Sequence, residues 1–181
     1  MVNRGDDMAP MNMLGVNLDL VEPKSAQEAI IRACVKRWFE KGPNGLLNSG
    51  DCSGFLKSVQ KELALRPFTG DANSIFDEVE HRADWQVLGV GKLGAACAGG
   101  AANQGFLAIA MWKNPHSGRP GHVAIVTSYL SFVGIKPEQH AIGAWGQLGA
   151  VGSLMDKMSK SFGAGKHSEI KYAKCTIRPF I

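Results

Sequence analysis

The chain has 181 residues, of which 45% are hydrophobic and 20% are charged, and its formal net charge is +4. This composition predicts one globular domain with a buried core, and the scattered Lys and Arg residues give no sign of a nucleic-acid-binding surface. No run of about 18 apolar residues predicts a membrane span. The first residues also lack the apolar segment of a signal peptide, so a protein that acts outside its cell would need another export route.

The chain begins with a segment that has no regular pattern. Glycine and proline interrupt residues 1–24, which we interpret as a flexible arm, and we interpret residues 25–181 as one folded domain. Ser25 and Glu28 have the spacing of a capping box, and apolar residues follow at helical intervals. They predict a first helix that runs to about Glu40.

A cysteine stands where a loop turns into an amphipathic helix. The run reads Gly50-Asp51-Cys52-Ser53-Gly54-Phe55, and the helical pattern continues over residues 56–63. At the first turn of a helix, free N–H groups and the helix dipole lower a thiol pKa, so Cys52 is a candidate nucleophile. Backbone amides at Ser53 and Gly54 would form an oxyanion hole, and the small residues would let a substrate approach the sulfur. The alternative is a buried apolar cysteine without a catalytic role.

The four cysteines do not have the CxxC spacing of a zinc site, so no metal is expected. If Cys52 stays free, at most one disulfide can form, and Cys34 with Cys175 is the first pair to consider. Cys97 lies in an Ala/Gly-rich run over residues 90–104. That run predicts a helix packed closely against another backbone, in which Cys97 would be a packing residue.

The second half of the chain has the pattern of strands. Before it, Asp71 or Asn73 would cap a helix that ends near Val79. Four segments then combine apolar runs or alternation with flanking turn residues. They cover residues 105–112, 122–127, 141–145 and 170–177. Helices first and strands afterwards predict an α+β fold, in which N-terminal helices pack on a small antiparallel sheet.

His122 opens the second of these strands, directly after Gly121. A thiol and an imidazole on two rigid elements could act together, with the imidazole taking the thiol proton and returning it to a leaving amine. A third polar group usually orients the imidazole, and His140 and Gln147 are the two candidates that the spacing leaves open. His122 could instead be a strand-end residue bonded to backbone, and the remaining histidines lie in polar segments where solvent explains them.

Two motifs together resemble those of the papain-like NlpC/P60 cell-wall peptidases. They are Asp51-Cys52-Ser53-Gly54-Phe55 and Gly121-His122-Val123-Ala124-Ile125-Val126. The closer similarity is to the type VI secretion amidase effectors, in particular the first, Tae1-like family, and it extends over about residues 25–175. Two features depart from that family. Ala29 stands where relatives can carry a disulfide cysteine, and residues 143–147 lack the cysteines of some relatives.

The resemblance implies a papain-like NlpC/P60 fold and a cysteine hydrolase that cleaves peptidoglycan stem peptides, with the D-glutamate–meso-diaminopimelate bond as the expected target. Cys52 would be the nucleophile and His122 the general base, without a cofactor or metal. It also implies an antibacterial effector made in the cytoplasm, carried by a type VI secretion apparatus into a rival's periplasm, and blocked by a cognate immunity protein. We expect the effector to be a monomer.

Two alternative functions stay open. The same scaffold could act as an amidase or acyltransferase on another substrate, although the polar loop over residues 113–121 offers no apolar surface to a lipid. The chain could also be a non-catalytic module that binds the cell wall, but such a module would not need a thiol and an imidazole together.

Overall fold

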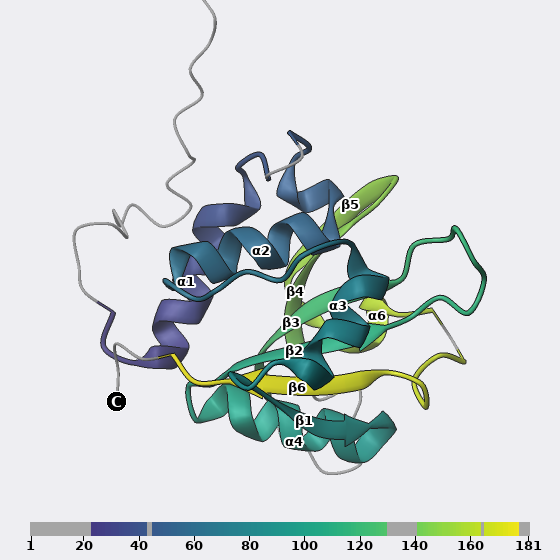
Figure 1. Cartoon of the computed structure of the whole chain (residues 1–181). Helices are drawn as coiled ribbons and strands as arrows, with labels where there is room; N and C mark the ends of the chain where they lie inside the picture. Colours follow the sequence, from purple (N-terminus) through teal and green to yellow (C-terminus); the bar gives the residue numbers. More distant parts are fainter. Residues whose placement is uncertain (1–22, 43–44, 130–140, 164, 178–181) are drawn as a thin grey trace, which may run out of the picture.

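The computed structural model describes residues 23–42, 45–129, 141–163 and 165–177 (Figure 1). Its centre is a sheet of six strands in the order β1-β6-β2-β3-β4-β5, with antiparallel pairing throughout. The strands are β1 (Trp85–Val90), β2 (Leu107–Trp112), β3 (His122–Tyr129), β4 (Ala141–Gln147), β5 (Ala150–Lys157) and β6 (Lys171–Cys175). The predicted α+β class is confirmed. The sheet is larger than predicted, because β1 and β5 add to the four expected strands.

Helices cover both faces of this sheet. Figure 1 shows α1 and α2 on one side of the sheet and α4 on the other. The helices are α1 (Ala26–Trp38), α2 (Cys52–Glu62), α3 (Ala72–Glu78), α4 (Gly91–Asn103) and α6 (Met158–Ser161), with 3-10 turns η2 (Asn48–Gly50) and η3 (Val79–His81). The expectation that N-terminal helices pack on the sheet therefore describes only one of its faces.

The buried residues form two cores, one on each face. Successive side chains of a strand point to opposite faces, so a central strand can contribute to both cores. On β2, Leu107, Ile109 and Met111 pack with α1, α2 and α3, whereas Ala108, Ala110 and Trp112 pack with α4 and α6. Every residue of β2 is buried as a result.

The start of α1 follows the capping pattern in the sequence. The side chain of Ser25 accepts a hydrogen bond from the backbone N–H of Glu28. The Glu28 carboxylate accepts from the backbone N–H of Lys24 at 2.8 Å, one residue before the cap. The helix ends at Trp38, two residues earlier than predicted.

The Ala/Gly-rich run forms α4, as predicted, and it lies close to its neighbours. A Cβ atom on Gly94 would come within 2.7 Å of the backbone oxygen of Gly89 and of the Tyr172 ring, so only glycine fits there. The small buried residues of α4 face the sheet. Cys97 lies on the opposite side of the helix and is exposed, so the prediction that it is a packing residue is wrong.

Cys34 and Cys175 are buried in the same core but remain free thiols. The disulfide between them, considered from the sequence, is therefore not formed. Most of the predicted flexible arm falls on residues 1–22, which lie outside the described residues. Within the part of the chain that the structure describes, no helix combines the length and apolar character that crossing a membrane requires.

Candidate active site

Cys52 is the first residue of α2, as the sequence predicts, and Asp51 is the N-cap. The Asp51 carboxylate accepts hydrogen bonds from the Ser53 N–H at 3.1 Å, the Gly54 N–H at 3.0 Å and the Ser53 hydroxyl at 3.0 Å. These bonds satisfy backbone amides that a helix start leaves unpaired. They also fix the conformation of the first turn, which begins at Cys52.

The same contacts bear on the roles expected for Ser53 and Gly54. Their amides already donate to Asp51, so the structure shows them as cap donors, and a role toward an oxyanion stays a prediction. Gly54 is buried, and a Cβ atom at this position would lie 2.4 Å from Asp51 Oδ2. Glycine is needed here because the capping carboxylate occupies the space that a side chain would fill. The predicted reason was different, namely room for a substrate to approach the sulfur.

The start of α2 lies against strands β3 and β4. The paired residues of these two strands begin with Ile125 and Ala144 and end with Tyr129 and Ala141. At the other end, a Cβ atom on Gly146 of β4 would come within 2.6 Å of the Asp51 backbone. The Val123 N–H on β3 is among the backbone groups that favour a thiolate at Cys52. Both strands therefore contact the first turn of α2.

Burial controls the ionisation of the Cys52 thiol. The side chain is 8% exposed, and this burial raises its pKa to about 11. The N–H groups of Val123, Ser53 and Cys52 act in the opposite direction, since each stabilises a thiolate, but their effect is smaller. The prediction of a lowered thiol pKa is therefore wrong, because loss of solvent outweighs the helix-start amides.

His122 is the first residue of β3, also as predicted. Its Nε2 lies 2.8 Å from the hydroxyl oxygen of Ser161, the last residue of α6. Its ring packs edge-to-face with the ring of Phe162, with ring centroids 5.1 Å apart. Burial, together with the positive charge of Lys166, lowers the imidazole pKa to about 4. The imidazole is therefore neutral at neutral pH and held by one nitrogen.

Of the two predicted orienting residues, Gln147 is the one that the described residues include, and no hydrogen bond joins it to His122 there. Gln147 is exposed at the end of β4, and His140 lies outside the described residues. The partner in this structure is Ser161, which the sequence reading did not single out. It lies on a four-residue helix that follows β5, and neither element has a sequence signal strong enough to place that hydroxyl beside His122.

The Cys52 thiol belongs to α2 and the His122 imidazole to β3, and no hydrogen bond joins them among the described residues. Val123, whose amide lies beside the thiol, directly follows His122. His122 pairs with Trp112 and shares its face of the sheet, whereas Val123 shares the face covered by α2. The catalytic pairing of this thiol with this imidazole therefore stays a prediction.

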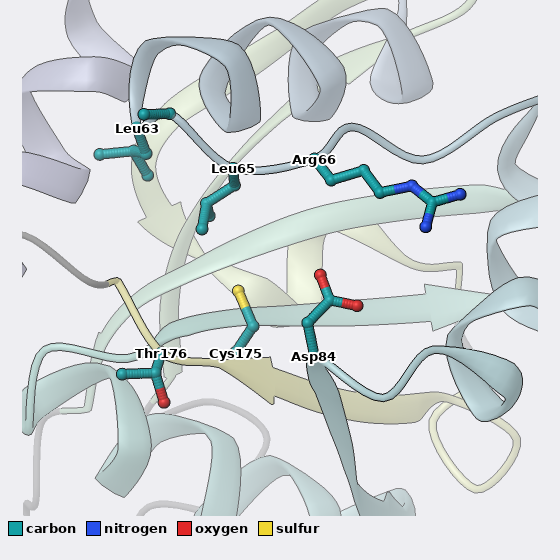
Figure 2. Close-up of a pocket in the computed structure, with 7 residues that line it drawn as sticks. Leu63, Leu65, Arg66, Asp84, Cys175 and Thr176 are labelled. Atoms are coloured by element: carbon teal, nitrogen blue, oxygen red, sulfur yellow. The ribbon is translucent and has the colours of Figure 1, made fainter.

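A separate cavity of about 490 Å³ lies at the far end of α2 (Figure 2). Its lining residues are Leu63, Ala64, Leu65, Arg66, Asp84, Cys175 and Thr176. Leu63 directly follows α2, and an 11-residue helix is about 16 Å long. Cys52 and His122 do not belong to this cavity. The described residues contain no group of three or more His, Cys, Asp or Glu side chains that could hold a metal ion.

Comparison with known proteins gives one informative similarity. No protein-family model matches the sequence. The chain is 39% identical over 105 residues to a protein of Pseudomonas aeruginosa named peptidoglycan amidase Tse1. The aligned region covers 58% of this chain and 62% of that relative, so the similarity spans less than two thirds of the relative's length.

Proposed function

We propose that this protein is a cysteine hydrolase that cleaves amide bonds in the peptide stems of peptidoglycan. The observation that carries the proposal is the position of the Cys52 thiol, at the first residue of a helix and beside the strand residue that follows His122. The similarity to a protein named as a peptidoglycan amidase supports the substrate class.

The proposed reaction starts from a neutral thiol and a neutral imidazole. Since Ser161 holds Nε2, Nδ1 of His122 is the nitrogen that takes the thiol proton as the sulfur attacks the scissile carbonyl. The protonated imidazole then gives this proton to the leaving amine, and a thioester forms on Cys52. Water, deprotonated by the neutral imidazole, hydrolyses the thioester and restores the thiol.

Burial of the site has a chemical consequence for this reaction. Burial destabilises both the thiolate of Cys52 and the imidazolium of His122. Proton transfer from the thiol to the imidazole must therefore be coupled to the attack of the sulfur on the carbonyl. The Val123, Ser53 and Cys52 amides near the thiol would stabilise negative charge while the sulfur attacks. Desolvation of the nucleophile is then offset by these fixed backbone dipoles.

The target bond, the route of delivery and the partners that we propose follow from the two sequence motifs around Cys52 and His122. The target bond is the amide between D-glutamate and meso-diaminopimelate, and the protein is a type VI secretion effector that acts in the periplasm of a rival bacterium. A cognate immunity protein would protect the producer by covering the site. The protein works as a monomer that needs neither a cofactor nor a metal.

Mass spectrometry of purified muropeptides incubated with the protein tests the proposal. We expect new fragments that correspond to hydrolysis between D-glutamate and diaminopimelate. Fragments from another amide bond would retain the cysteine mechanism and change the target bond. No fragments from well-folded protein, over a wide range of protein concentration, would contradict the proposal.

A further inference from the structure

A lysine ammonium group lies beside the proposed general base. Lys166 Nζ stands 3.6 Å from the centre of the Trp112 ring, in a cation–π contact. Trp112 is the residue directly opposite His122 in the β2–β3 ladder, so both side chains project from the same face of the sheet. Lys166 thus reaches, from the segment between α6 and β6, the part of the sheet where the proposed base stands.

The ammonium group of Lys166 has no carboxylate partner within 4 Å among the residues that the structure describes. Three other lysines do have such a partner: Lys113 pairs with Asp77, Lys160 with Asp156 and Lys171 with Glu80. The acid nearest to the same ring system is Glu169, whose Oε2 accepts a hydrogen bond from the Trp112 indole N–H at 2.9 Å. Glu169 is therefore bound at the ring edge, while Lys166 occupies the ring face.

We propose that Lys166, held on the face of Trp112, binds a carboxylate of the substrate next to the scissile amide. This inference rests on the proposed function. The chemistry of the substrate fits it, because a D-glutamate linked through its side-chain carboxyl keeps a free α-carboxylate beside the bond to be cleaved. Diaminopimelate carries a further carboxylate on the other side of that bond. A charge-assisted hydrogen bond from an ammonium group suits either one.

Carboxylate binding at this position would also act on the reaction itself. Burial is the main reason that the imidazole pKa is lowered, and the positive charge of Lys166 further disfavours a protonated His122. A bound carboxylate would compensate that charge and make the imidazole a better proton acceptor. A substrate with the carboxylate would therefore be both bound and turned over faster than one without it.

Three synthetic stem peptides separate the two sources of the carboxylate. The first has D-glutamate followed by meso-diaminopimelate, the second has the α-carboxamide in place of the D-glutamate α-carboxylate, and the third has lysine in place of diaminopimelate. We expect the wild-type protein to hydrolyse one of the two altered peptides at least tenfold more slowly, by kcat/KM, than the first. Equal rates on all three would overturn the inference.

Variants then test whether Lys166 causes this preference. Lys166→Met should lose most of the wild-type kcat/KM on the first peptide, so that it cleaves the first peptide and the slowly cleaved altered peptide at nearly equal rates. Lys166→Arg should keep the preference for the first peptide. Lys113→Met is the matched control, since Lys113 pairs with Asp77 on the surface, and it should behave as the wild type. A Lys166→Met protein that slows equally on all peptides would contradict the inference. If the wild type cleaves none of them, the proposed function itself fails.

Discussion

The hydroxyl oxygen of Ser161 lies 2.8 Å from Nε2 of His122, and these two residues are 39 positions apart in the chain. The serine hydroxyl can accept from Nε2–H or donate to Nε2, and the first arrangement leaves the lone pair on Nδ1 free. Phe162 packs edge-to-face with the same ring. The proposed mechanism uses the arrangement with the free lone pair on Nδ1, which can then take the thiol proton.

Removing this hydroxyl should slow the reaction without unfolding the protein. We expect Ser161→Ala to lower kcat/KM on muropeptides at least tenfold, about 1.4 kcal/mol of transition-state stabilisation, mainly through kcat. Ser161→Thr, which keeps a hydroxyl, should recover part of the loss. Ser168→Ala is a control at an exposed serine of the following loop. Unchanged kinetics for Ser161→Ala would remove Ser161 from the mechanism.

The pH dependence of kcat/KM should report the buried imidazole. A general base works only when it is neutral, and burial and Lys166 lower the pKa of His122 to about 4. Activity should therefore persist as the pH falls from 7 to about 5, and decline only as the pH approaches 4. Lys166→Met should move this acidic limb to higher pH, because a neighbouring positive charge is gone. An acidic limb near pH 6.5 in the wild type would show an ordinary, solvated histidine.

The same imidazole should make the folded state sensitive to acid. In the unfolded chain His122 binds a proton below about pH 6.5, whereas in the folded protein it does so only below about pH 4. The unfolded state thus binds more protons in this window, so the free energy of unfolding decreases as the pH falls through it, by about 3 kcal/mol in total.

Urea denaturation at several pH values measures this decrease. A His122→Ala protein should show a smaller loss of stability between pH 6.5 and pH 4 than the wild type. His116→Ala, which removes an exposed histidine, should lose as much stability as the wild type does. Identical pH dependence in wild type and His122→Ala would contradict the assignment of the acid sensitivity to this residue.

Two glycine-to-alanine substitutions in helices should have opposite effects. At Gly54 the added Cβ would lie 2.4 Å from Asp51 Oδ2, so the N-cap must shift, and we expect a loss of about 1 to 3 kcal/mol in the free energy of unfolding together with lower activity. At Gly100, within α4, nothing lies within 4 Å of the added Cβ, and alanine should stabilise by about 0.5 to 1 kcal/mol. Chemical denaturation compares the two. A neutral Gly54→Ala would mean that the cap tolerates the methyl group.

Local sequence signals predicted the parts of the site that depend on local structure. The change from a loop to an amphipathic pattern at Cys52 identified the start of α2, and the apolar run after Gly121 placed His122 at the start of β3. The capping role of Asp51 is equally local, because it depends only on the residues of the first turn of α2.

The missing parts depend on tertiary packing. Ser161 and Lys166 reach the site from segments without a strong helical or strand pattern, and only the folded chain brings them beside His122 and Trp112. The raised pKa of Cys52 reflects burial between a helix and two strands, which no local pattern reports. β1 and β5 escaped prediction because both lie at sheet edges, largely exposed, and their pairing with neighbouring strands is interrupted by register shifts.

The most direct test of the central claim is a comparison of two cysteine substitutions on purified muropeptides. Cys52→Ala removes the proposed nucleophile, and Cys97→Ala removes a thiol that is exposed on α4. Circular dichroism establishes that both proteins are folded. The account predicts that Cys97→Ala releases fragments at the wild-type rate and that Cys52→Ala releases none. Hydrolysis by folded Cys52→Ala at a rate near that of the wild type would contradict the account.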